Sequence, residues 1–253
     1  MNAILHTPGA RRLPMLRCYL LETKYEFLRL LRMPSFAVPA LTFPALFYVL
    51  FGVLLTRGQA SSQMLVGYGV FGIMGPALFG FGVAMALDRE LGLLKLKRAM
   101  PVPPGAVLLA KTLMAMMFAT IITAMLMTLA FTTAGVRLDP GQVALLTAIN
   151  VLGTLPFCAI GLYIGTLVSG QGAAAIVNLV YLPMAFLSGL WIPLSMLPEV
   201  IARLAPIWPA YHLNQVALKV IDADAGGSVW MHIVVLLAYP AVFFFLARRR
   251  LSN

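Results

Sequence analysis

The sequence predicts an all-α, polytopic membrane protein with six transmembrane helices. The first reason is composition: 61% of the residues are hydrophobic, 10% are charged, and the mean hydropathy is +0.94. So few polar groups cannot cover a globular surface, so the bilayer is the natural solvent. The second reason is six apolar runs of about the 20 residues that a helix needs to cross a bilayer. The third is that most basic residues fall on one side of these runs.

The six runs divide the chain into three parts. We expect a cytoplasmic segment over residues 1–35, a transmembrane domain over residues 36–247 and a cytoplasmic tail over residues 248–253. The predicted spans are Phe36–Leu55, Met64–Leu87, Ala106–Phe131, Val143–Val168, Ala173–Pro193 and Val229–Ala247.

The distribution of charge predicts the orientation. Of the 18 Lys and Arg residues, six precede the first span, five lie between the second span and the start of the third, and three follow the last span. The positive-inside rule places these segments, and therefore both termini, in the cytoplasm. A net charge of +10 could also indicate nucleic-acid binding. Its one-sided distribution favours loops that face cytoplasm and lipid, so we expect a bilayer and no nucleic acid as partner.

A helical, amphipathic segment precedes the first span. Apolar residues recur at helical spacing over Met15–Arg32, and Pro34 ends the helix because proline cannot continue the hydrogen-bond ladder. Such a helix lies in the membrane interface rather than across it. It is either a plain anchor or also a gate helix that touches a cytoplasmic partner. The candidate gate residues are Glu22, Glu26, Arg29 and Arg32.

Six charges interrupt the apolar sequence between the second and third spans, within Asp88–Arg98. The spacing of Leu87, Leu91 and Leu94 predicts a short helix over about 88–98. Its acidic residues stand at the start and its basic residues at the end, as the helix dipole favours. A charged loop between two spans is ordinary, so a plain connection and a docking site for a soluble partner both stay open.

A second irregular segment lies between the fifth and sixth spans, over about 194–218. Prolines interrupt it, and Glu199 and Arg203 stand at i, i+4 spacing. We expect two short helices that form a re-entrant hairpin from the outer side. An external loop with interfacial Trp208 and Tyr211 is the alternative.

The chain contains no motif for nucleotide binding or for hydrolysis. A P-loop needs Gly-x-x-x-x-Gly-Lys-Ser/Thr, and that pattern is missing, as are Gly-x-Ser-x-Gly and His-Glu-x-x-His. The two cysteines, Cys18 and Cys158, predict neither a disulfide framework nor a metal cluster. We therefore expect no catalytic residue, metal or cofactor on this chain. A polytopic membrane enzyme, or a channel or assembly subunit without ATP coupling, remains the alternative.

Three segments, in order, resemble one family. Glu22–Leu55, ETKYEFLRLLRMPSFAVPALTFPALFYVLFGVLL, is similar to the segment that leads into the first span of type-2 ATP-binding-cassette (ABC-2 type) exporter permeases. Asp88–Lys111, DRELGLLKLKRAMPVPPGAVLLAK, resembles the family's first cytoplasmic loop, although Leu93 stands where threonine is common. Leu182–Leu218 resembles its fifth span and hairpin, closing on Pro209-Ala210-Tyr211-His212-Leu213.

This resemblance implies a transport subunit rather than an enzyme. The 88–98 segment would be a coupling helix that docks on a separate ATPase subunit. Two ATPase copies would bind ATP and Mg, and this chain would pair with itself or with a second permease in a bacterial-type inner (plasma) membrane. The complex would export an amphipathic or lipid-like substrate, such as a drug, lipid or glycan.

The resemblance also implies roles for particular residues. The ATPase-coupling residues would be Asp88, Arg89, Glu90, Leu91, Gly92, Leu93 and Leu94. The candidate pathway lining, because the fifth span faces the dimer centre in the family, is Tyr181, Phe186, Ser188 and Trp191. The outer gate would comprise Glu199, Arg203, Tyr211 and His212.

Overall fold

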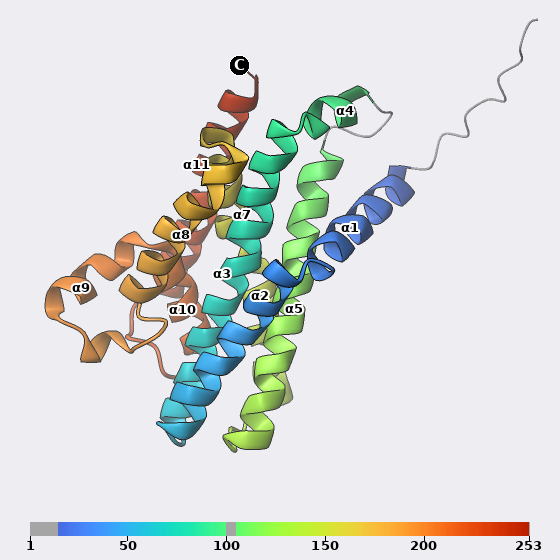
Figure 1. Cartoon of the computed structure of the whole chain (residues 1–253). Coiled ribbons are helices and arrows are strands. Elements are labelled where there is room, and N and C mark those ends of the chain that lie inside the picture. Colours follow the sequence, from blue (N-terminus) through green and yellow to red (C-terminus); the bar gives the residue numbers. More distant parts are fainter. Residues whose placement is uncertain (1–14, 100–104, 253) are drawn as a thin grey trace, which may run out of the picture.

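The computed structural model describes residues 15–99 and 105–252, and every regular element in these ranges is helical (Figure 1). The elements are α1 (Met15–Leu31), α2 (Pro34–Phe47), the π-helix η1 (Tyr48–Leu54), α3 (Gln59–Glu90), α4 (Leu93–Ala99), α5 (Ala106–Thr133), α6 (Pro140–Leu152), α7 (Thr154–Leu167), α8 (Gly170–Leu187), the 3₁₀ turns η2 (Leu194–Met196) and η3 (Ala205–Ile207), α9 (Glu199–Leu204), α10 (Pro209–Lys219) and α11 (Val229–Ser252).

Six helical segments of the described chain are long and apolar enough to cross a membrane, which confirms the predicted number. They are Pro34–Leu54, Gln59–Glu90, Ala106–Thr133, Pro140–Leu167, Gly170–Leu187 and Val229–Arg250. The fourth segment is broken at Gly153 into α6 and α7. Pro156 explains the break, because it has no N–H to donate to the carbonyl of Leu152.

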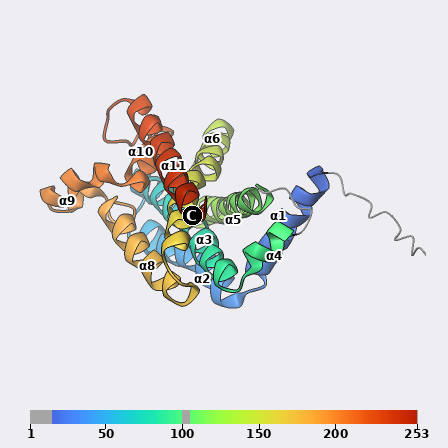
Figure 2. The ribbon, with the colours of Figure 1, turned by 90° about the horizontal axis from the view of Figure 1, so that it is seen from above.

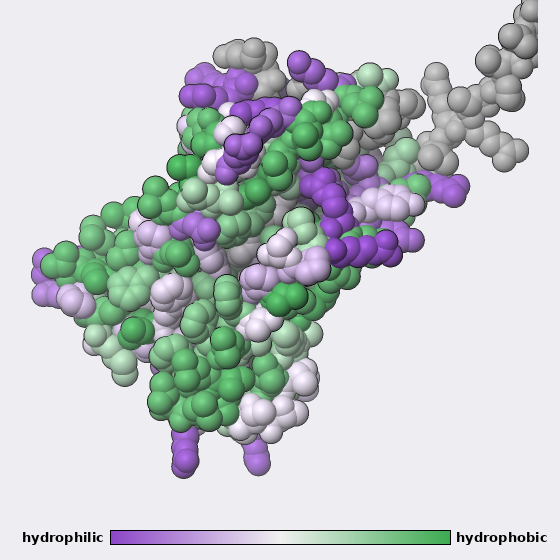
Figure 3. All heavy atoms as spheres, in the orientation of Figure 1, coloured by the Kyte–Doolittle hydropathy of each residue, from purple (hydrophilic) through white to green (hydrophobic). Residues whose placement is uncertain are grey.

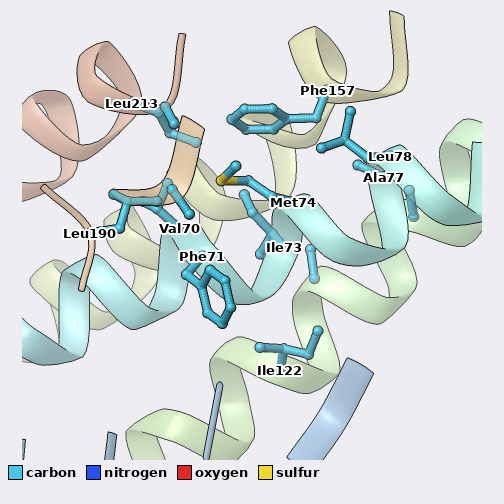
Figure 4. Close-up of a cluster of buried hydrophobic side chains, with 14 of the residues drawn as sticks. Val70, Phe71, Ile73, Met74, Ala77, Leu78, Ile122, Phe157, Leu190 and Leu213 are labelled. Atoms are coloured by element: carbon cyan, nitrogen blue, oxygen red, sulfur yellow. The ribbon is translucent and has the colours of Figure 1, made fainter. Parts of the chain in front are cut away.

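The long helix α3 forms the centre of the molecule. It packs mainly against α5, α7 and α8, and Figure 2 shows these helices around it. One side of the core is drawn in Figure 4, where α3 residues meet Ile122 of α5, Phe157 of α7 and Leu213 of α10. The α3 side chains in this cluster, Val70, Phe71, Ile73, Met74, Ala77 and Leu78, are all buried.

Glycines allow α3 and α7 to approach closely. A Cβ atom added at Gly161 of α7 would lie 2.9 Å from the carbonyl oxygen of Leu78, and one added at Gly82 would lie 2.9 Å from the carbonyl oxygen of Gly161. Backbone contacts of this kind are typical of helix pairs in membranes, where small residues permit van der Waals packing.

The polar residues are concentrated toward one end of the helical bundle. Figure 3 shows apolar atoms over much of its middle, and polar atoms at the end that carries α4 and along α1. The carboxyl end of α11 lies at the same end of the bundle as α4 (Figure 1). The outer helices expose large apolar side chains, among them Phe43 of α2, Leu179 of α8 and Trp230 of α11. Such surfaces need lipid or protein to cover them.

Candidate functional site

Four charged side chains meet where α1, α3 and α5 come together. The Nζ atom of Lys111 lies 3.1 Å from Glu26 Oε1 and 2.9 Å from Asp88 Oδ2. The guanidinium of Arg29 lies 3.1 Å from Asp88 Oδ1 and 3.5 Å from Glu26 Oε2. We call these four residues the ion cluster.

The ion cluster is balanced and largely enclosed. The side chains of Lys111, Glu26 and Asp88 are 0%, 4% and 4% exposed, and Arg29 closes the cluster at 43%. Burying a charge is costly unless opposite charges and hydrogen bonds compensate it. Here two carboxylates face two cations, so each buried charge has an opposite charge beside it.

Each helix presents its charge by local geometry. Glu26 and Arg29 stand three residues apart and share one face of α1. Asp88 lies in the last turn of α3, and Lys111 lies in the second turn of α5. The family's loop pattern ends on a lysine at this position, but Lys111 was not among the residues predicted for the site.

Arg89 and Glu90 connect the same end of α3 to two further helices. Arg89 donates hydrogen bonds to the carbonyl oxygens of Thr166 and Val168 at the end of α7, and the bond to Val168 measures 3.1 Å. Glu90 Oε2 accepts from the N–H of Gly170, the first residue of α8, at 2.6 Å. Both contacts suit the helix dipole, with a cation at a C-terminus and an anion at an N-terminus.

The predicted helix over about 88–98 is divided in two. Asp88–Glu90 complete α3, and a separate helix, α4, starts at Leu93. Gly92 separates them with φ of +71°, and its N–H bonds to the carbonyl of Arg89 at 3.1 Å. Glycine is the residue that adopts this left-handed conformation without penalty at the end of a helix.

The break turns apolar side chains outward. Leu91 is 71% and Leu96 58% exposed, whereas Leu93 and Leu94 are partly buried and Leu94 packs on the core. The side chains of Lys97 and Arg98 lie outside the described residues. Of the predicted coupling residues, Asp88 is therefore buried, whereas Arg89 and Glu90 are exposed and hydrogen-bonded to neighbouring helices. Leu91 forms an exposed apolar surface together with Leu96, which was not predicted to take part.

The predicted gate residues of α1 occupy different environments. Glu26 is buried in the ion cluster, Glu22 is partly buried, and Arg32 is exposed. The face that α1 turns to the protein carries Thr23, Glu26 and Leu30, while Leu16 and Leu20 are exposed. Glu26 was predicted as a gate residue that contacts a cytoplasmic partner, but its burial on this inner face was not predicted.

An apolar groove of about 420 Å³ runs between α2, α3 and α8. Two predicted pathway residues, Tyr181 and Trp191, line it, together with Asn178. Phe186 contacts the Trp191 ring, with the ring centres 6.4 Å apart. Ser188 is fully buried and is not part of the groove lining.

The segment between α8 and α11 contains two α-helices, α9 and α10, flanked by 3₁₀ turns. Glu199 and Arg203 of α9, which stand at i, i+4 spacing, form an ion pair at 2.7 Å on the surface. Tyr211 and His212 lie on α10, and His212 contacts His232 of α11. His232 was not predicted to belong to this site, since a separation of 20 residues carries no local signal. That the segment between α8 and α11 is re-entrant, and that it acts as a gate, stay predictions.

The six membrane-length helices and their all-helical packing define a polytopic integral membrane protein. The chain belongs to the ABC-2 type transporter family, whose sequence model matches residues 18–221. This confirms the family expected from the resemblance.

Two curated relatives support the same assignment. "Putative transport permease YvfS" of Bacillus subtilis (strain 168) is 26% identical over 232 residues, covering 88% of this chain and 92% of YvfS. "Inner membrane transport permease YhhJ" of Escherichia coli (strain K12) is 26% identical over 172 residues, covering 67% of this chain and 46% of YhhJ. The chain thus spans about half the length of YhhJ. Family membership makes it a membrane permease subunit of an ABC transporter and implies association with an ABC ATPase subunit.

Proposed function

We propose that this chain is the membrane half of an ATP-driven exporter. Two permease subunits, either two copies of this chain or this chain and a relative, pair with two ATPase subunits that bind ATP and Mg. The substrate is an amphipathic or lipid-like molecule, such as a drug, lipid or glycan, which leaves the cytoplasm or the inner leaflet. A membrane enzyme or a passive channel is the weaker alternative, because neither uses an exposed docking surface at the ion cluster.

The observation that carries this proposal is the exposed leucine surface beside the ion cluster. Leu91 and Leu96 are exposed before and within α4, which lies at one end of the bundle (Figure 1), and Asp88 lies three residues before Leu91. Asp88 is tied to α1 through Arg29 and to α5 through Lys111. A displacement of α4 by the bound ATPase is therefore transmitted to α1, α3 and α5 together.

This arrangement changes the role that we assign to the acidic-basic-acidic triplet. Asp88, Arg89 and Glu90 hold the end of α3 against its neighbours, and we propose that they position the docking surface. Leu91 and Leu96 make the apolar contact with the ATPase, and exposed residues of α1, such as Arg32, extend that contact.

We further propose that the groove between α2, α3 and α8 forms one wall of the pathway. Its aromatic lining suits an apolar chain, and Tyr181 and Trp191 add a hydroxyl and an indole N–H to that lining. A second permease subunit would close the open side. Glu199, Arg203, Tyr211 and His212 belong to the outer gate in this scheme.

The docking proposal is tested by the double variant Leu91→Asp/Leu96→Asp. Both side chains are exposed, so the folded permease should remain, while two carboxylates make an apolar contact unfavourable. We expect the ATPase subunit to co-purify at less than about a tenth of the wild-type yield, equivalent to a loss of about 1.4 kcal/mol or more.

The matched control is Leu55→Asp, an exposed leucine at the opposite end of the first span. It should leave the ATPase yield unchanged. An undiminished complex in the Leu91→Asp/Leu96→Asp variant would show that the ATPase docks elsewhere. Direction and substrate class are tested separately, by ATP-dependent uptake of labelled lipids, glycolipids and hydrophobic drugs into inside-out vesicles.

A further inference from the structure

Two histidines are buried against each other where α10 meets α11. His212 and His232 are 2% and 1% exposed, and their Nδ1 atoms lie 2.8 Å apart. The Nε2 atom of His212 lies 2.8 Å from the carbonyl oxygen of Pro206 in η3. The Nε2 atom of His232 is enclosed and has no hydrogen-bond partner among the described residues. His212 belongs to the proposed outer gate, but neither the proposed docking nor the proposed pathway gives a role to its contact with His232.

The contacts define where the hydrogens lie in the neutral pair. A carbonyl oxygen only accepts, so Nε2 of His212 carries the hydrogen that it donates to Pro206. A neutral imidazole has one N–H, which makes Nδ1 of His212 an acceptor. Nδ1 of His232 must then donate to it, and the lone pair on Nε2 of His232 remains unused.

We propose that the His212–His232 pair is a proton-binding site that clasps the η3–α10 segment to α11 while neutral and releases it on taking up a proton. The proposed proton binding and the resulting release depend only on the contact between His212 and His232, and not on the function proposed above. That the released segment is the outer gate rests on the function proposed above.

Proton uptake has a defined place and consequence. The incoming proton forms an N–H bond with the unused lone pair on Nε2 of His232, no other bond breaks, and the pair gains one positive charge. This charge and its new N–H would be buried without an acceptor, which is unfavourable. Protonation at Nδ1 of His212 instead would bring two N–H groups face to face at 2.8 Å. Both protonated forms become more stable when the two rings separate and water can solvate the charge and the N–H groups.

Few other ionisable groups surround the pair. The Tyr211 ring centre lies 5.3 Å from that of His212, and Tyr239 of α11 donates its hydroxyl to the carbonyl of Ile207. Lys219 and Asp224 form an ion pair at 2.8 Å and both influence His232. Among the other helices packed on α10 or α11, α6 and α7 contain no charged residue, and the charged residues of α3 lie at its far end.

Asp224 and Tyr211 keep a constant charge while histidine titrates. The hydrogen bond from Lys219 lowers the pKa of Asp224, and burial raises the pKa of Tyr211, so the first stays ionised and the second neutral. Histidine alone changes charge between about pH 5 and 8. Because the clasp disfavours the protonated form, it is intact above the ordinary histidine pKa of about 6.5 and is lost as the pH falls below it.

Ring ¹⁵N NMR of the full chain in lipid nanodiscs tests the proton assignment. The chain has three histidines, and His6 lies outside the described residues, so His6→Gln leaves signals from this pair alone. At pH 8 we expect one Nε2–H and one Nδ1–H tautomer with scalar coupling between the two Nδ1 atoms. At pH 5 the pair should hold one more proton and the coupling should vanish. Coupling that persists at pH 5, or its absence at pH 8, would overturn the proposal.

Hydrogen-exchange protection of residues 205–219 tests the release. Protection should fall about tenfold or more between pH 8 and pH 5 in the unaltered chain. In His232→Asn, whose amide retains a donor near Nδ1 but cannot bind the proton, it should be nearly independent of pH. Asp224→Asn serves as the matched control and should retain the wild-type fall.

An equal fall in His232→Asn would assign the effect to another group and reject the clasp. If that variant does not fold, the NMR titration of the unaltered pair still decides. Neither measurement involves the ATPase or a substrate, so the clasp can fail while the exporter proposal stands, and the reverse.

Discussion

At the scale of single residues, Lys111 has the most demanding environment in the described chain. It is fully buried, yet it contacts two carboxylates from two other helices. A buried ion group of this kind adds little net stability compared with an apolar cluster of the same shape, but it tolerates the loss of a partner badly. The ion cluster therefore specifies how α1, α3 and α5 fit together.

Replacing Lys111 with methionine tests this requirement. Methionine is nearly as long as lysine but removes the buried positive charge between Glu26 and Asp88, and we expect a loss of about 3–5 kcal/mol in the free energy of unfolding. Denaturant titration of the purified permease in detergent measures it. Lys95→Met is the control, because Lys95 is exposed on α4 and its removal should change stability by less than about 0.5 kcal/mol. Equal stability of the two variants would contradict the role of the cluster.

At the scale of elements, two glycine positions have different tasks. Gly92 ends α3 with a positive φ, and so sets the direction in which α4 leaves the bundle. Gly161 adopts ordinary helical structure, and its small size lets α7 lie against α3. One position needs the backbone freedom of glycine and the other needs its lack of a side chain.

Substitutions at Gly92 separate backbone strain from steric contact. No atom lies within 4 Å of an added Cβ, so any cost arises from φ, at about 1–2 kcal/mol for a β-branched residue. We expect Gly92→Val to redirect α4 and reduce ATPase co-purification. Gly92→Asn should retain it, because asparagine tolerates the left-handed region. The same yield from both variants would exclude a role for this turn in docking.

Alanine substitutions at Gly161 and Gly141 should shift stability in opposite directions. At Gly161 the new Cβ meets the backbone oxygen of Leu78 at 2.9 Å, so α3 and α7 must separate, at about 1–3 kcal/mol. At Gly141, near the start of α6, the Cβ meets nothing, and alanine should stabilise the helix by about 0.5–1 kcal/mol. Thermal unfolding in detergent compares them, and a stabilised Gly161→Ala variant would contradict the close packing.

At the scale of the whole molecule, most segments rich in basic residues and the ion cluster share one end of the bundle. The carboxyl end of α11 with its arginines lies at this end, together with α4 (Figure 1). The His212–His232 pair lies on α10 and α11, away from the cluster on α1, α3 and α5. The proposed ATPase docking surface and the proposed outer gate therefore lie in different parts of the molecule.

Single cysteines test which end faces the cytoplasm. In a chain with Cys18→Ser and Cys158→Ala, Lys95→Cys and Ser228→Cys place exposed thiols at α4 and before α11. In right-side-out membrane vesicles, a membrane-impermeant maleimide should label position 228 at once and position 95 only after the vesicles are opened. The reverse pattern would invert the proposed orientation.

Much of the architecture could be predicted because its signals are local. The six spans follow from runs of apolar residues, and the α1 helix follows from periodicity ended by Pro34. Less local features were missed or misplaced. The helix expected over 88–98 was divided by Gly92, and the fourth span was divided at Gly153, because a hydropathy run does not report backbone breaks.

The number of spans and the ABC-2 type family could be predicted without coordinates, because hydrophobicity and segment order are properties of the chain alone. The pairing of the charged and polar side chains, by contrast, depends on the packing of the helices. Lys111 meets Glu26 across 85 positions, and His212 meets His232 across 20. Such contacts depend on how helices pack and rotate against one another, and no spacing along the sequence specifies that packing. For the same reason, the structure turned Asp88 inward and left Leu91 on the surface.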